Sequence, residues 1–353
     1  MKNIFNGWTY LLSALFIVLF LIAFSLQSVH YRFSADDIFF TEVTISKGLS
    51  GAIEFFYNEQ NGRLGAHILC CVLFYIGSKW SGIFILWQFV LLLFMLFSLN
   101  FFFRTLSQRI AERTFAKHEQ LLFSFLFIAI CYLSILPVNT EMWHWTAGTS
   151  VHTFSFILMI LSAAWLLKHQ YSHQLKHSLF GFFLLLIAGS FSESNLITML
   201  AIVTVIWLRS FFIEKFFSLI LTAALLGLST ALLINILSPG IKVRLNQLPD
   251  FTFLQAIKNT IHTYWDLLKA THFKVLILLP VIFTISRMNK NHRIILKGNT
   301  KRMLIVSLLT IGTLNIFVSC FLLSDLAPIR SLLLPIYCLV GAIVLSVADT
   351  AKQ

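Results

Sequence analysis

Two adjacent acids, Asp36 and Asp37, follow a long apolar run near the start of the sequence. A carboxylate can take a proton from a hydroxyl group as a general base, or it can bind a divalent cation. Ser34 precedes Asp37 by three residues, which is also the pattern of a helix N-cap followed by acids that the helix dipole favours. Both roles stay open, because a cap needs only one acid and adjacent helical side chains point about 100° apart.

Further charged and aromatic residues lie next to turns or at the ends of apolar runs. Three arginines follow turn sequences, and a planar guanidinium group matches two phosphate oxygens. Two glutamates lie close to apolar runs, where an unpaired carboxylate is costly and marks a site or an ion pair. A Trp-His-Trp sequence offers flat rings beside an imidazole. The candidates for substrate or phosphate binding are Arg63, Glu141, Trp143, His144, Trp145, Glu193, Arg244 and Arg330.

The composition places these residues in a membrane protein. Of the 353 residues, 58% are hydrophobic and 11% are charged, and the mean hydropathy is +0.86. A soluble domain carries about 25% charged residues. The apolar runs are continuous, which indicates helices instead of the alternating strands of a barrel. We therefore predict one all-α integral membrane domain over residues 1–353, a polytopic bundle of about ten spans.

The predicted spans follow the apolar runs. They cover residues 9–26, 83–103, 121–136, 151–167, 179–191, 196–208, 216–237, 275–285, 303–323 and 332–347. The first run is interpreted as a transmembrane helix and not as a cleaved signal peptide, because no small-residue cleavage site follows it. The run 64–77 would be about 21 Å long as a helix, shorter than a hydrocarbon core of about 30 Å. Whether it spans the membrane or is re-entrant stays open.

The charge distribution predicts the orientation. With 64–77 left out of the count, both termini are cytoplasmic, and that side carries 16 of the 26 Lys and Arg residues but only 4 of the 14 acids. The formal charge of +12 is therefore an orientation signal and not a sign of nucleic-acid binding. Two long loops, 28–80 and 238–272, then face outward. The first carries the acidic pair and juxtamembrane helices over 38–57, interrupted by Gly48 and Gly51.

Taken together, six short motifs resemble one class of enzyme. They are Ala35-Asp36-Asp37 after the first span, Asn61-Gly62-Arg63, Glu141 before a Trp-rich sequence and Gly148, Gly189 four residues before Glu193, Pro239-Gly240 before Arg244, and the late Arg330. The chain resembles the GT-C class of membrane glycosyltransferases, and within it bacterial O-antigen glucosyltransferases of the Gtr type.

The resemblance implies a GT-C fold in the bacterial inner membrane, with the active site facing the periplasm. It implies an inverting transfer of a sugar from a polyprenyl-phosphate donor to a cell-surface or lipid-linked glycan, with Asp36 or Asp37 as base or metal ligand. A site with Mg²⁺ or Mn²⁺ held by Asp36, Asp37 and Glu193 and a metal-free site both stay open. So do two other functions, an O-antigen-type polymerase and a flippase or transporter of lipid-linked sugars.

Overall fold

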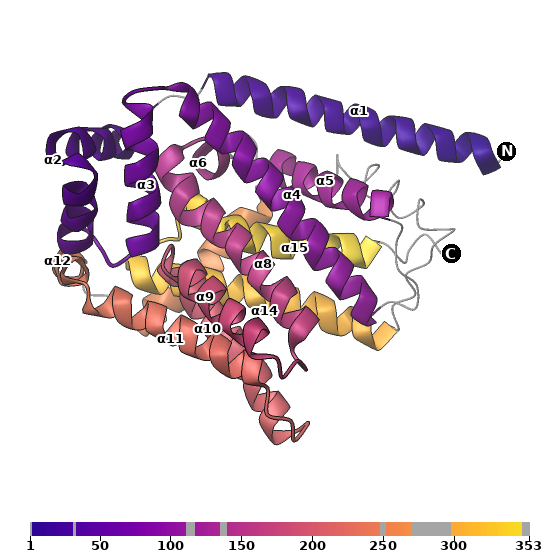
Figure 1. The fold of residues 1–353 in the computed structure, drawn as a ribbon. Coiled ribbons are helices and arrows are strands. Elements are labelled where there is room, and N and C mark those ends of the chain that lie inside the picture. Colours follow the sequence, from indigo (N-terminus) through magenta and orange to yellow (C-terminus); the bar gives the residue numbers. More distant parts are fainter. Residues whose placement is uncertain are drawn as a thin grey trace.

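The computed structural model describes residues 2–30, 33–110, 117–134, 140–247, 252–269 and 298–347, and all elements in these ranges are helices. Most of the helices form a bundle, and a smaller group of helices gathers at one end of it (Figure 1). The bundle helices are α1 (Lys2–Val29), α4 (Gly82–Ile110), α5 (Lys117–Ser134), α8 (Phe154–His169), α9 (Leu175–Gly189), α10 (Glu193–Phe212), α11 (Leu219–Leu237), α14 (Gly298–Leu323) and α15 (Leu333–Val347).

Five described helices are long and apolar enough to cross a membrane. They are Gly82–Arg109, Thr146–His169, Glu193–Phe212, Leu219–Leu237 and Thr300–Leu323. Five more apolar helices are only 10–17 residues long: Ser13–Val29, Leu64–Gly77, Gln120–Leu133, Leu175–Gly189 and Leu333–Ser346. The all-helical, membrane-type architecture agrees with the prediction, and nine of the ten predicted runs fall on helices. The tenth, 275–285, lies outside the described residues, and the number of ten spans stays a prediction.

The main core lies between α1, α4, α5 and α15. Aromatic side chains fill it, since Phe20 and Phe24 of α1 pack edge-on or tilted against Tyr132 of α5, and Tyr337 of α15 meets Phe127. A second cluster joins α8, α9, α10 and α11. Close packing of these helices leaves the connecting segments at the ends of the bundle.

One end of the bundle carries α2 (Ala35–Glu59), α3 (Leu64–Gly77) and α12 (Pro239–Gln247), at the left of Figure 1. Gly48 interrupts α2 with φ 69° and ψ 175°, which confirms one of the two predicted breaks, whereas Gly51 is helical. Only glycine adopts such a positive φ without strain. The two halves of α2 pack on α3 through stacked rings of Phe40, Phe56 and Phe74. We refer to this region as the loop end.

Candidate functional site

Two arginines and one glutamate from three separate segments meet at the loop end. Arg63 Nε lies 2.5 Å from Glu193 Oε2, and Arg244 Nη1 lies 3.3 Å from Glu193 Oε1. The side chains are 17%, 20% and 10% exposed for Arg63, Arg244 and Glu193. The structure therefore brings together three of the predicted binding residues as a partly buried cluster with an excess of one positive charge. We call these residues the arginine–glutamate cluster.

The Asn61-Gly62 turn positions Arg63. Asn61 Oδ1 accepts a hydrogen bond from the Arg63 amide at 3.1 Å, and it lies 3.0 Å from Nε2 of His67 on the next turn of α3. A Cβ atom added to Gly62 would lie 2.4 Å from the backbone oxygen of Asn235, at the end of α11. Glycine is therefore required for this close backbone approach.

Helix α12 positions Arg244 against the same turn. Ser238, which precedes α12, donates its hydroxyl to the backbone oxygen of Tyr57 at 2.7 Å. A Cβ atom on Gly240 would lie 2.7 Å from that oxygen and from the Asn61 nitrogen. One hydrogen bond and one close backbone contact therefore hold α12 against α2. In this position of α12, Arg244 contacts Glu193.

Glu193 is the first residue of α10, after Ser192 in extended conformation. A carboxylate in the first turn of a helix is favoured by the positive end of the helix dipole. The bend before it is tied to α3, since the Gly65 amide donates to the Ser190 oxygen at 3.1 Å. Turns from three parts of the chain thus contact one another and place the three charges together.

Burial shapes the electrostatics of the cluster. Burial lowers the pKa of Arg244, and the nearby Arg63 lowers it further. Burial likewise lowers the pKa of His67 to about 4, and Arg63 adds to this effect, so His67 is neutral at pH 7. The two guanidinium groups are close enough to repel each other, and one carboxylate compensates only half of their charge.

The acidic pair divides into one structural and one exposed residue. Asp37 is fully buried at the start of α2, where Oδ2 accepts from the Ser34 amide at 3.1 Å and Oδ1 from the Ala147 amide at 3.0 Å. Ser34 in turn accepts from the Asp37 amide at 3.3 Å, so that the two residues form a capping box. Asp36 is exposed. The cap interpretation is therefore confirmed for Asp37, and Asp36 is the carboxylate of the pair that solvent reaches.

Asp36 and Asp37 lie at the start of α2 and do not belong to the arginine–glutamate cluster. The Ala147 residue whose amide binds Asp37 packs with Cys70 of α3 in one cluster of buried residues. Cys70 follows Arg63 by seven residues, which is roughly 10 Å along a helix. The acidic pair and the arginines thus border the same helix, with a separation greater than one hydrogen bond.

The aromatic candidates lie deeper than the sequence suggested. His144 is buried, with Nδ1 2.7 Å from Gln88 Oε1 and Nε2 2.7 Å from the Tyr132 hydroxyl, and burial lowers its pKa to about 4. Trp143 is fully buried against Phe24. The two residues are part of the core in this structure, and neither presents a face on which a sugar could stack.

The remaining predicted residues lie elsewhere at the bundle's ends. Trp145 is partly buried and covers Gly148, whose added Cβ would meet its ring. Glu141 is half-buried on α6 (Thr140–Trp143). Helix α6 packs against the 3-10 helix η2 (Ile329–Leu332), which contains Arg330. The side chain of Arg330 lies outside the described residues.

A buried polar cluster was not predicted. Asn315 of α14 donates from Nδ2 toward Thr198 Oγ1 at 3.0 Å and Asn195 Oδ1 at 3.3 Å, and Asn195 donates to Ser155 Oγ at 3.0 Å. These side chains come from three candidate spans and lie next to Glu193. An asparagine inside an apolar run was the signal that could have indicated it, because polar groups in membrane helices face partners.

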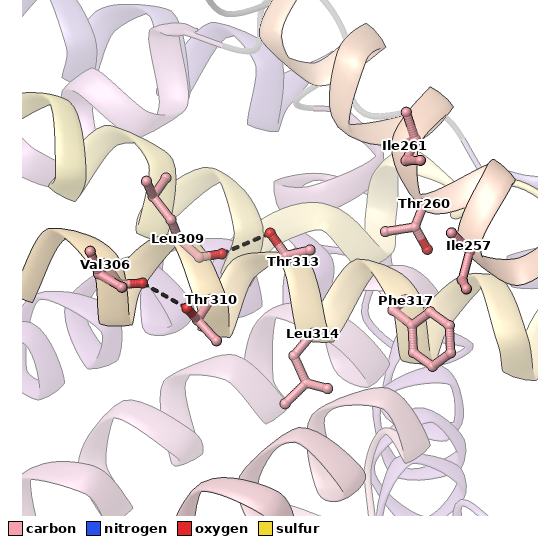
Figure 2. Close-up of a pocket in the computed structure, with 9 residues that line it drawn as sticks. All are labelled: Ile257, Thr260, Ile261, Val306, Leu309, Thr310, Thr313, Leu314 and Phe317. Atoms are coloured by element: carbon pink, nitrogen blue, oxygen red, sulfur yellow. Dashed lines mark hydrogen bonds between the residues drawn. The ribbon is translucent and has the colours of Figure 1, made fainter.

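An apolar groove of about 570 Å³ lies between α14 and the helix 253–269 (Figure 2). Its lining includes Ile257, Ile261 and Phe317. The threonines in it turn their hydroxyls to their own helices, since Thr310 donates to the Val306 oxygen and Thr313 to the Leu309 oxygen, each at 2.8 Å. None of the predicted site residues lines this groove.

The residues proposed as metal ligands do not fit one shared ion. Asp37 directs both carboxylate oxygens at backbone amides, and Glu193 is held by two guanidinium groups. A Mg²⁺ or Mn²⁺ site would need carboxylate oxygens turned to a common point. Among the residues that the structure describes, no group of three or more His, Cys, Asp or Glu side chains is arranged to hold a metal.

In comparisons with known proteins, no protein family, no curated protein and no solved structure matches this chain.

Proposed function

We propose that this protein is a membrane glycosyltransferase that takes a sugar from a polyprenyl-phosphate donor and transfers it to a cell-surface or lipid-linked glycan. The observation that carries the proposal is the arginine–glutamate cluster. Arginine pairs from separate loops suit a phosphate, because each guanidinium presents parallel N–H groups to two oxygens. The two arginines are partly exposed, so a ligand reaches them from the loop end.

In this proposal the phosphate of the donor binds at Arg63 and Arg244. As the bond between the sugar's C1 and the phosphate oxygen breaks, negative charge gathers on the leaving polyprenyl phosphate. Guanidinium groups already in position stabilise that charge, which lowers the barrier. No step in the proposed reaction needs a metal ion.

Asp36 is the proposed base that takes the proton of the acceptor hydroxyl. In an in-line displacement the acceptor hydroxyl approaches C1 from the side opposite the leaving phosphate, so the base lies on that opposite side as well. The attacking oxygen lies about 3 Å from C1 and the base about 3 Å beyond it. The acidic pair begins α2, which packs on α3, the helix that Arg63 precedes, and the side chain of Asp36 is exposed to solvent, which supports such an arrangement. Asp37 holds the start of α2 and so positions its neighbour.

The membrane-type helices support a lipid-linked donor. Its hydrocarbon tail stays in the bilayer while its phosphate reaches charged residues at the end of the helices. We propose that the loop end faces the periplasmic side of a bacterial inner membrane, because the positive charges predicted to be cytoplasmic lie on the other loops. The kinked α2, whose sequence is amphipathic, then lies in the interface.

The proposal is tested by sugar transfer from a polyprenyl-phosphate sugar to a glycan acceptor, with the purified protein in lipid nanodiscs. Arg63→Gln and Arg244→Gln are expected to abolish transfer, and Asp36→Asn to lower it at least a hundredfold, since general-base catalysis contributes about 10²–10⁴-fold. The matched control is Arg209→Gln, which breaks the exposed Arg209–Glu214 ion pair of 3.2 Å. Full transfer by folded Asp36→Asn and Arg244→Gln variants would rule the mechanism out.

The buried polar cluster favours one second candidate, a flippase or transporter of lipid-linked sugars. Transport sites are built from polar groups within the spans, and Asn195, Thr198 and Asn315 provide neutral ones. Movement of a fluorescent polyprenyl-phosphate sugar across proteoliposomes, without any transfer to an acceptor, would favour this function over the first.

A further inference from the structure

The arginine–glutamate cluster carries one positive charge that nothing close to it compensates among the residues that the structure describes. Arg63 and Arg244 contribute two charges and Glu193 removes one. His67, which packs beside them, is neutral because burial keeps its pKa at about 4. Apart from Asp37, which is buried at the start of α2 where it binds the amides of Ser34 and Ala147, the other charged side chains described on the packed helices α2 and α12 are exposed to water, which screens them. They include Glu54, Glu59 and Lys242.

The two contacts to Glu193 are unequal. Arg63 is 2.5 Å from the carboxylate, and its backbone is fixed by the Asn61 side chain. Arg244 is 3.3 Å away, a longer and weaker contact. Arg63 and Glu193 therefore form the closer pair, and Arg244 is the less compensated of the two arginines. A phosphate bound between the two arginines therefore meets more uncompensated charge at Arg244 than at Arg63.

We infer that Glu193 sets the charge of this site to one positive unit, so that the site takes a phosphodiester in preference to a dianionic phosphate monoester. This inference rests on the proposed function. A lipid-linked sugar is joined through a phosphodiester with one negative charge, which neutralises the cluster. The polyprenyl phosphate that leaves is a monoester, and its second charge meets the carboxylate of Glu193. Donor binding is favoured over retention of the product.

An arginine pair without a carboxylate would behave in the opposite way. Coulomb attraction rises in proportion to the ligand charge, whereas the cost of desolvating the ligand rises with about the square of that charge. Two uncompensated guanidinium groups offset the larger cost of a dianion, and a site of one net charge does not. Glu193 is thus a specificity-determining residue, and its effect appears as a ratio of two affinities. A ratio separates it from a general loss of binding, which would lower both affinities together.

The experiment measures the binding of two short, soluble isoprenoid probes to the purified protein in nanodiscs. Citronellyl phosphate is the monoester, and its methyl ester is the diester. At pH 8 the wild-type protein is expected to bind the diester more tightly. Glu193→Gln keeps the shape of the side chain and removes its charge, and we expect it to shift the ratio about tenfold or more toward the monoester. An unchanged ratio in folded Glu193→Gln would overturn the inference.

A second measurement needs no variant. The second pKa of a phosphate monoester is about 6, so the probe is mainly a monoanion at pH 5 and a dianion at pH 8. The wild-type protein is expected to bind citronellyl phosphate several-fold more tightly at pH 5, while its affinity for the diester stays constant. Tighter binding of the dianion at pH 8 would contradict the inference even if Glu193→Gln fails to fold.

Two controls separate this inference from the proposed function. Glu214→Gln removes a carboxylate from an exposed ion pair with Arg209 and is expected to leave both affinities unchanged. Neither probe undergoes sugar transfer, so binding is measured independently of catalysis. A protein that shows the expected ratio but transfers no sugar refutes the proposed enzyme and keeps the phosphodiester site. A protein that transfers sugar but prefers the monoester dianion refutes the role of Glu193 alone.

Discussion

Replacing Asp37 by Asn should unfold the start of α2, whereas the same replacement of Asp36 should not. Asp37 is fully buried, and its two carboxylate oxygens accept from the backbone amides of Ser34 and Ala147. Asparagine keeps one acceptor oxygen and replaces the other by an NH₂ group that faces an N–H donor. Asp36 lies at the neighbouring position with an exposed side chain, so the pair provides its own control.

The size of the effect follows from these bonds. A hydrogen bond to a charged group contributes about 1.5–3 kcal/mol, and loss of an N-cap costs about 0.5–2 kcal/mol. One bond survives in Asp37→Asn as a weaker neutral bond, while the other is lost and leaves a buried donor unsatisfied. We therefore expect a destabilisation of about 2–4 kcal/mol. Exposed Asp36→Asn should stay within about 0.5 kcal/mol of the wild type.

Thermal unfolding in detergent micelles, followed by tryptophan fluorescence, measures both variants under identical conditions. Asp37→Asn should melt several degrees below the wild type and lose transfer activity only in proportion to the folded fraction. Asp36→Asn should melt with the wild type and yet lose activity. If Asp37→Asn melts like the wild type, or if Asp36→Asn is destabilised as much, the assignment of one acid to the cap and one to solvent is wrong.

Three further outcomes are expected. Gly62→Ala should lower the melting temperature, because the new Cβ would lie 2.4 Å from the Asn235 oxygen and overpacking costs about 1–3 kcal/mol. The control Gly181→Ala, whose Cβ would lie 3.4 Å from its nearest neighbour, should leave the melting temperature unchanged. The free energy of unfolding should fall as the pH drops from 6.5 to about 4, because His144 takes up a proton in this range when unfolded and stays neutral when folded. The contribution of His144 to this fall is at most about 3 kcal/mol. A His144→Gln variant should flatten that part of the pH profile of the melting temperature, and an unchanged profile would assign it to other groups. Asn315→Leu should destabilise by about 1–3 kcal/mol, because it removes the donor that Asn195 Oδ1 accepts from, and a neutral result by the same assay would show that the buried polar cluster contributes nothing to stability.

The helical, membrane-type architecture could be predicted because apolar periodicity and length are local properties of the sequence. The break of α2 at Gly48 is also local, since only glycine takes the required φ without strain. The ion pairs of Glu193 could not be predicted in the same way. Arg63 lies 130 residues from Glu193 in sequence and Arg244 lies 51 residues away. Their residue types and turns were apparent, but their pairing depends on how three loops pack.

The roles of Asp36 and Asp37 could not be assigned from the sequence either, because they too depend on a distant segment. The spacing of Ser34 and Asp37 indicated a cap, and the adjacent acid left a base equally possible. The structural role of Asp37 became apparent from Ala147, 110 residues away, whose amide donates a hydrogen bond to the second carboxylate oxygen of Asp37. Trp143 and His144 were predicted to bind substrate. His144 is buried because Tyr132 and Gln88 of neighbouring helices provide hydrogen-bond partners for its ring, and Trp143 packs on Phe24.

Backbone contacts, more than the charges themselves, determine the spacing of the arginines. Gly62 and Gly240 are both at positions where a Cβ atom would lie within 3 Å of a backbone atom from another segment. The guanidinium groups repel each other and would separate if only Glu193 held them. Since the turns that contain or precede them are locked by backbone contacts, removing the carboxylate should change the charge of the site more than its shape. That distinction is why the affinity ratio for mono- and dianionic phosphate esters tests the role of Glu193 more directly than loss of binding would.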